Sequence, residues 1–245
     1  MSNHYTSLLL AFAMVMTVAA QSDAMHGMQG DTACTTKVTC GFGFIVPGIS
    51  WVDIDNFNDF IATQGISSFK AMTPTLSIGG HKEKRRLIME SGLTLRYWRD
   101  NVNSNLRTSL FAGDMVWNNG INVLPAALPL TAFPYFGLGV GLAAVHLRND
   151  EKTFSQLLAS SEPDATLWQA SFLLNVGGGA DVFLIKKGST RGMALGIRAG
   201  YLFDPFSRKR DRKWRSGRTD IVDVPILRQN SPYLRLVIGG VRAQK

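Results

Sequence analysis

The chain has 245 residues, 18% of them charged, and a formal net charge of +8. This length suits one large domain or two small ones, and the charged fraction is below the roughly 25% of a typical soluble chain. Abundant glycine and the lack of a low-complexity tract or internal repeat exclude a repeat array and indicate tight turns or closely packed strands.

The N-terminus reads as an export signal. The first twenty residues hold no Lys, Arg, Asp or Glu, and the apolar run 8–20 is shorter than the about 20 residues of a membrane-spanning helix. Small residues up to Ala20 then precede a polar stretch. We predict a signal peptide over 1–20 and a periplasmic segment over 21–38, with a short buried helix as the alternative to the signal.

Cys34 and Cys40 are the two cysteines of the chain. In an oxidising compartment this spacing can close a small loop, and a disulfide or two unremarkable thiols are both open. No histidine pair lies near them, and His26 and His81 have no convincing partner, so no metal site and no cofactor are expected.

Period-two alternation marks the strands. In 87–98, every second residue from Leu87 to Tyr97 is apolar except Ser91, whereas Glu90, Thr94 and Arg96 fall on the other face. No apolar run beyond the signal is long enough for a membrane helix, so a chain in a membrane must close into a barrel to pair its backbone. We predict eight strands of about 9–14 residues at 39–46, 71–79, 87–98, 106–117, 133–147, 171–184, 193–203 and 231–241.

The stretch GVGLAA, residues 139–144, also fits the glycine pattern of a dinucleotide-binding turn. Such a turn needs a buried strand before the glycines and a helix after them. Here the alternation runs through the glycines without a break, which favours a strand and leaves the nucleotide site as a minor alternative.

Loop lengths orient the barrel, since such proteins have short periplasmic turns and longer outer loops. Within the first outer loop, Phe57, Phe60 and Ile61 have helical spacing, with Asp53 or Asp55 as cap and Gly65 as end, which predicts a short helix on the rim. The predicted outer loops are 49–70, 99–105, 148–168 and 205–230, and the predicted inner turns are 80–86, 118–132 and 185–192.

The segments YFGLGVGL, GIRAGYLFDPF and SPYLRLVIGG resemble strands of small bacterial outer-membrane β-barrel proteins, the group similar in architecture to OmpA, OmpX and OmpW. The resemblance covers 39–245 and implies an all-β fold, an eight-stranded antiparallel up-and-down barrel in the outer membrane. The chain closes on GGVRAQK, whereas such barrels usually end on an aromatic residue.

The polar faces carry ionisable groups that would point into the lumen, with Asp114 as a further candidate. An eight-stranded barrel has an interior filled by side chains, where opposite charges such as Arg96 and Glu90 are expected to pair. The inward glycines would leave room for bulky Arg and Trp side chains from facing strands. An ionic plug is the main interpretation and the lining of a narrow pore the alternative. The predicted network is Glu90, Arg96, Asp181, Arg198 and Arg235.

A basic stretch, residues 207–218, lies in the last outer loop. Outside the cell it would meet lipopolysaccharide phosphates, which Arg contacts well, with Trp214 at the headgroup level; a solvated loop is the plainer alternative. Export argues against nucleic acid as a partner. The basic residues are Arg208, Lys209, Arg210, Arg212, Lys213, Arg215 and Arg218.

Some small outer-membrane barrels are lipid-modifying enzymes that use Ser and His at the rim. His146 lies near an outer strand end, followed by Ser155, Ser160 and Glu162, but no spacing brings them within hydrogen-bond reach. We therefore assign no catalytic residue and expect a structural or surface-interaction role. A narrow solute channel is the first alternative and a rim-active lipid enzyme the second.

Overall fold

The computed structural model describes residues 39–63, 67–103, 106–125, 128, 130–149, 164–185, 191–206, 213–216, 219–221 and 224–244. The signal peptide, the segment 21–38, His26 and Cys34 lie outside these ranges, so what is predicted of them, including the disulfide, remains a prediction. In the described part of the chain, no helix has the length and apolar character needed to cross a membrane.

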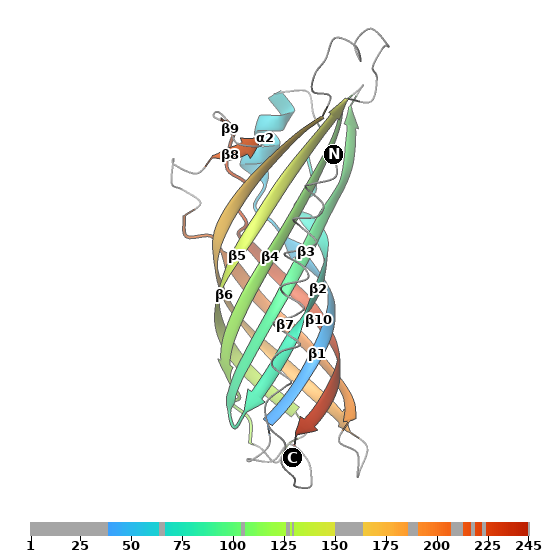
Figure 1. Ribbon diagram of the computed structural model, residues 1–245, viewed down its shortest axis with the longest axis vertical. Coiled ribbons are helices and arrows are strands. Elements are labelled where there is room, and N and C mark those ends of the chain that lie inside the picture. Colours follow the sequence, from blue (N-terminus) through green and yellow to red (C-terminus); the bar gives the residue numbers. More distant parts are fainter. Residues whose placement is uncertain are drawn as a thin grey trace.

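Long antiparallel strands form a closed, tilted barrel, which Figure 1 shows from the side. Each strand pairs with its neighbours in sequence, β10 pairs with β1, and the β5–β6 pairing completes the ring. This confirms the predicted eight-stranded up-and-down barrel. The barrel strands are β1 Thr39–Trp51, β2 Met72–Lys84, β3 Leu87–Asn103, β4 Leu106–Ile121, β5 Leu130–Asn149, β6 Asp164–Ile185, β7 Arg191–Phe203 and β10 Ser231–Gln244.

The register sets the tilt of the strands. A path from each residue to its partner on the next strand leaves β1 at Cys40 and returns to β1 at Ser50, ten residues further along. This stagger is the shear that closes a tilted barrel. The path runs through Cys40, Glu83, Ile88, Gly120, Tyr135, Gly177, Gly200, Tyr233 and Ser50.

The two faces of the wall have the predicted chemistry. Outside, large apolar side chains are exposed, as for Leu76 at 52% and Leu236 at 58%, whereas inward Arg96 and Arg198 are 2% and 3% exposed. A continuous apolar exterior of this extent is disfavoured in water and matches the lipid-facing band of a membrane barrel. The alternation read from the sequence is therefore confirmed on the strands where it was clearest, β3, β6 and β7.

The strands are longer than predicted, up to 20 residues in β5 and 22 in β6. At roughly 3.3 Å per residue and a tilt of about 45°, a strand of this length rises about 45 Å, well beyond an apolar band of about 25 Å. Figure 1 shows β3 to β6 continuing past the other strands at the end opposite the C-terminus. The predicted loops 99–105 and 148–168 are correspondingly shorter, because their ends belong to strands.

The end of the barrel opposite the C-terminus, called the outer end here after the predicted orientation, carries three small elements that are visible beside the barrel in Figure 1. Helix α2, Asp55–Thr63, lies where the sequence predicted it and buries Phe57 and Ile61. Two short strands that the sequence did not indicate, β8 Trp214–Ser216 and β9 Thr219–Ile221, extend the sheet from β6. At the inner end the tight β2–β3 turn places Arg85 at a φ of 60°, which is uncommon for a residue other than glycine.

Two adjacent glycines of β2 provide a matched test of the inward and outward faces. A Cβ on inward Gly79 would lie 2.7 Å from the Phe44 ring, whereas a Cβ on outward Gly80 would have its nearest neighbour at 4.0 Å. We expect Gly79→Val to lower the free energy of unfolding by about 1–3 kcal/mol through overpacking. Gly80→Val should raise it by about 0.5–1 kcal/mol, because glycine weakens a strand. Urea titration of the barrel in micelles measures both, and equal effects would contradict the assignment of faces.

Candidate functional site: the charged interior and the outer cap

The inner half of the lumen is built around Arg198 of β7. Its Nη1 and Nη2 donate to Asp181 Oδ1 and Oδ2 at 2.7 and 2.9 Å, and its Nε and Nη2 donate to Glu90 Oε2 at 2.9 and 2.8 Å. Glu90 and Asp181 come from β3 and β6, so one guanidinium joins three strands. This bidentate geometry is the strong form of an Arg–carboxylate pair.

Local sequence makes room for this cluster. A Cβ on Gly179, the partner of Arg198 across the β6–β7 ladder, would lie 2.7 Å from Arg198 Cδ. The guanidinium carbon also lies 4.8 Å from the centre of the Phe133 ring. Inward glycines thus accommodate large side chains, as predicted. The arginine beside Gly179 comes from the adjacent strand rather than from a facing one, and the aromatic ring next to its guanidinium belongs to Phe133 rather than to a Trp.

His81 borders the same cluster. Its Nδ1 lies 3.4 Å from Glu90 Oε2, and its ring stacks on Phe42 with centroids 4.4 Å apart. The sequence indicated no partner for His81, because Glu90 faces it only through the β2–β3 register.

A chain of polar side chains crosses the middle of the lumen. The Tyr135 and Tyr233 hydroxyls are 2.7 Å apart, Tyr233 donates to Asn175 Oδ1 at 2.9 Å, and Asn175 donates to Asn118 at 2.8 Å. These residues lie on β5, β10, β6 and β4, so the chain links opposite walls. The sequence pattern indicates no partner for these residues, although the alternation along β10 and β6 places Tyr233 and Asn175 on inward faces.

The outer half holds a second ion pair. Arg96 Nη2 lies 2.7 Å from Asp114 Oδ2, and Arg96 Nε donates to Ser50 Oγ at 3.1 Å. The predicted pairing of Arg96 with Glu90 is wrong. Both lie on β3, six residues or about 20 Å apart at the rise of a strand, which exceeds the reach of two side chains.

The remaining predicted lumen residue, Arg235, joins neither ion pair. Its guanidinium carbon lies 4.1 Å from the centre of the Tyr233 ring. All five predicted residues thus face the interior, but they divide between an inner cluster and an outer group.

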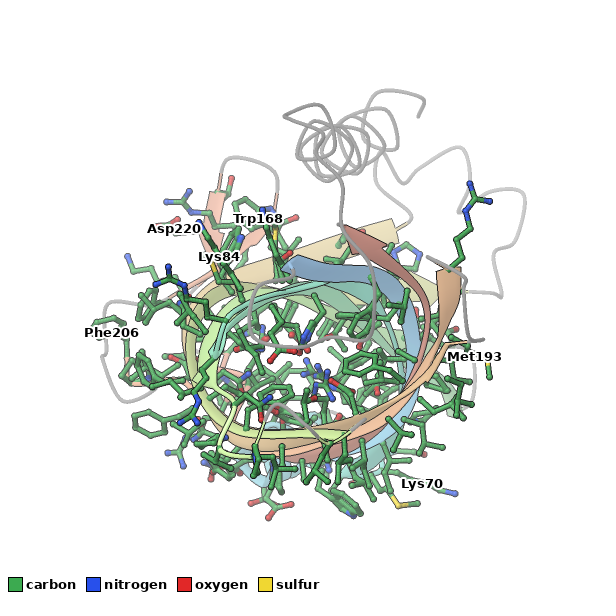
Figure 2. All side chains as sticks on the ribbon, turned by 90° about the horizontal axis from the view of Figure 1, so that it is seen from below. Lys70, Lys84, Trp168, Met193, Phe206 and Asp220 are labelled. Carbon is green, nitrogen blue, oxygen red and sulfur yellow. The ribbon has the colours of Figure 1, made fainter. Side chains whose placement is uncertain are left out.

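An apolar cap covers the outer mouth. We use this name for α2 and the segment 213–230, of which 213–216, 219–221 and 224–230 are described. Phe57 and Ile61 of α2 pack with Trp214 and Leu227 against inward Trp98 and its neighbours. Seen from the inner end, side chains crowd the interior of the barrel (Figure 2).

Hydrogen bonds hold this cap in place. Gln169 of β6 donates to Leu227 O at 3.0 Å and accepts from Leu227 N at 3.1 Å, while Trp214 Nε1 donates to Pro225 O at 2.9 Å. Trp214 is 0% exposed, so its predicted place at the headgroup level is wrong. The loop folds inward over the mouth and carries the indole with it.

The described part of the basic stretch is already paired. Lys213 Nζ and Arg215 Nε lie 3.4 and 3.2 Å from the Asp220 carboxylate. Arg215 also lies over the Trp168 ring at 5.7 Å, and Figure 2 labels Trp168 and Asp220 outside the wall. The other predicted basic residues, Arg208, Lys209, Arg210, Arg212 and Arg218, lie outside the described residues.

Of the residues considered for an enzyme site, the structure describes His146. His146 Nδ1 lies 3.0 Å from Thr166 Oγ1 in an exposed contact across β5 and β6. Ser155, Ser160 and Glu162 lie outside the described residues. Within the described ranges, no group of three His, Cys, Asp or Glu side chains is placed to hold a metal ion.

No family model matches the chain, and no curated protein is significantly similar in sequence. The solved structures that are similar to it in backbone include the following three. Ail, the attachment invasion locus protein of Yersinia pestis, is 7% identical, with 84% of this chain and 99% of that chain covered and a TM-score of 0.45. Neisserial surface protein A is 12% identical, with 84% and 97% covered and a TM-score of 0.37.

The third is a major outer membrane protein from Thermus thermophilus, 11% identical, with 83% and 99% covered and a TM-score of 0.44. The assignment of the present chain follows from its own closed ring of strands, its apolar exterior and its charged interior. It is a closed eight-stranded antiparallel β-barrel whose apolar outer face fits a membrane.

Proposed function

We propose that this barrel is a non-conducting scaffold that holds an outer surface for interactions at the cell envelope. The observation that supports this role is the closure of the lumen at two levels. The apolar cap lies over the outer mouth. Beneath it, the ion pair between Arg198 of β7 and Glu90 of β3 crosses the interior, and the pair of Arg96 with Asp114 fills space beside the wall. A barrel closed in this way presents its rim and its projecting strands β3 to β6 rather than a path for solutes.

A closed lumen predicts no ion current. We expect the purified barrel to give no conductance steps in a planar bilayer at neutral pH, although heat-dependent gel mobility shows that it is folded. A double variant that weakens the cap, Gln169→Ala with Trp214→Ala, removes both hydrogen-bonded anchors and should give brief openings. Stable unitary currents from the wild-type protein would instead favour the narrow-channel function.

The basic outer stretch supports an anionic partner, for which lipopolysaccharide phosphates have the matching chemistry. Arg215 and Lys213 share Asp220, so their charges are partly compensated. We expect replacement of Arg208, Lys209, Arg210 and Arg212 by Gln to weaken binding to lipopolysaccharide micelles several-fold, as measured by co-sedimentation. Arg215→Gln, which removes a charge already paired with Asp220, should have a smaller effect. Unchanged binding in the fourfold variant would contradict this partner.

A further inference from the structure

The inner end of the barrel, where the C-terminus lies in Figure 1, has a strongly basic surface. Its exposed cations come from the end of β2, the β2–β3 turn and the start of β7. They are Lys82, Lys84, Arg85, Arg86 and Arg191. These cations gather on one side of the rim, because the β4–β5 connection, residues 122–129, holds no charged residue.

No exposed carboxylate that the structure describes balances these cations. At the inner end, Glu83, Glu90 and Asp181 face the lumen, and Glu83 and Asp181 are 7% and 0% exposed. An uncompensated basic surface favours an anionic partner. The exposed carboxylates of the described ranges lie at the outer end, on α2 and β9, and are Asp55, Asp59 and Asp220.

The cations on the strands lie on the outward face of the wall. Lys82 and Lys84 continue the outward face of β2 that includes Leu76, and Arg191 continues that of β7 beyond Met193. Long Lys and Arg side chains at the edge of an apolar surface extend their charged ends toward water and headgroups. These cations therefore lie where the apolar band ends and lipid headgroups begin.

The register places Lys82 and Arg191 on one row. Successive partners from β2 to β7 are Lys82, Gly41, Arg242 and Arg191. Three strand spacings, about 14 Å, separate the two ends of this row, and Gly41 contributes no side chain to it. The long side chains of Lys82 and Arg191 can thus approach one phosphate group from two sides.

The next row toward the middle of the membrane band has no side chains on three neighbouring strands. Gly80, Gly43 and Gly240 are successive partners on β2, β1 and β10. A Cβ at Gly80 or Gly43 would lie 4.0 or 3.8 Å from its nearest neighbour, and one at Gly240 would have none within 4 Å. The space outside this row is therefore open. Beyond it, Ile45 and Ile238 are 57% and 50% exposed. Glycine inside a strand often marks the close approach of a ligand.

From this arrangement we propose that the inner end binds an anionic glycerophospholipid. The phosphate lies between Lys82 and Arg191, the glycerol backbone lies against the glycine row, and the acyl chains cover Ile45 and Ile238. The basic surface selects an anionic headgroup, because it repels the ammonium group of a zwitterionic one. This site lies at the opposite end from the cap and the basic outer stretch, so its failure and that of the proposed function are distinguishable.

Native mass spectrometry of the full chain, refolded in a non-ionic detergent, tests the proposal. The protein is titrated with phosphatidylglycerol in one arm and with phosphatidylcholine of the same acyl chains in the other. We expect saturable binding of phosphatidylglycerol, with an affinity at least about tenfold higher than for phosphatidylcholine. Equal affinities for the two lipids would overturn the proposal.

Charge variants locate the site. Lys82→Gln with Arg191→Gln should weaken phosphatidylglycerol binding at least about tenfold, because two cations at the headgroup level are lost. Phosphatidylcholine binding should not change. Lys70→Gln with Arg228→Gln is the matched control, since it removes as many positive charges from the outer end and should keep the wild-type affinity. An equal loss in the two pairs would show a general charge effect and contradict the site.

A variant with every charge retained tests the glycine row. Gly43→Leu with Gly240→Leu fills the space in which the glycerol backbone is proposed to lie, and both positions have room for a side chain. We expect several-fold weaker phosphatidylglycerol binding by a barrel that is folded, as shown by heat-dependent gel mobility. Wild-type affinity in this variant would overturn the proposed placement of the lipid.

Discussion

Replacing Arg198 by methionine is expected to lower the free energy of unfolding by about 3–5 kcal/mol, because the substitution leaves buried carboxylates without their counter-charge. Arg198 is the common partner of Glu90 and Asp181, which are 9% and 0% exposed at their side chains. Urea titration in micelles, followed by heat-dependent gel mobility, measures the change.

Two further variants test the cause of this loss. Arg191→Met removes an exposed arginine from the inner end of the same strand and should cost less than about 1 kcal/mol. Removing all three charges, with Glu90→Gln and Asp181→Asn added to Arg198→Met, should recover much of the loss, since a neutral replacement of a buried ionic cluster is often tolerated. A single Arg198→Met variant as stable as the wild type would show that the cluster does not hold the strands together.

The second large effect is expected at the cap. Trp214→Ala should lower the free energy of unfolding by about 3–5 kcal/mol, the range for truncating a buried Trp. The substitution empties the space beside Phe57, whose ring centroid lies 5.8 Å away, and removes the donor to Pro225 O. We expect faster proteolysis within 213–230 as the earliest sign.

A lipid-facing tryptophan is the control for this variant. Trp117 is 47% exposed on the outer face of β4, so Trp117→Ala removes a similar side chain without leaving a cavity. It should have a smaller effect on stability and none on proteolysis of the cap. If Trp214→Ala leaves the cap as resistant to protease as in the wild type, this indole does not anchor the loop.

The strands and their two faces were predictable from the sequence because the alternation of side chains is a local property of extended backbone. The exposed faces of β3, β6 and β7 and the inward direction of the charged residues follow from that period. The helix over Phe57 and Ile61 was predictable from a different local pattern, apolar residues at helical spacing. The residues at which the strands begin and end were less predictable. The outer ends of β5 and β6 continue past the membrane band, where polar residues replace the apolar signal although the ladder persists.

The partners of the charged residues were not predictable in the same way. Arg96 pairs with Asp114 rather than with Glu90. Trp214 packs against Phe57 of α2 rather than lying at the level of the lipid headgroups. Each contact joins residues on different strands or loops, and its geometry depends on the shear of the barrel and the path of a long loop. The residue pattern of a single strand specifies neither the shear of the barrel nor the path of the loop.

By itself, the sequence determined that extended segments expose one face to lipid and the other to a crowded polar interior. It could do so because each residue's face depends only on its own strand. Only the tertiary structure decided which carboxylate neutralises which arginine and how the outer mouth is covered. Those outcomes require the stagger between strands, which arises when the first and last strands pair.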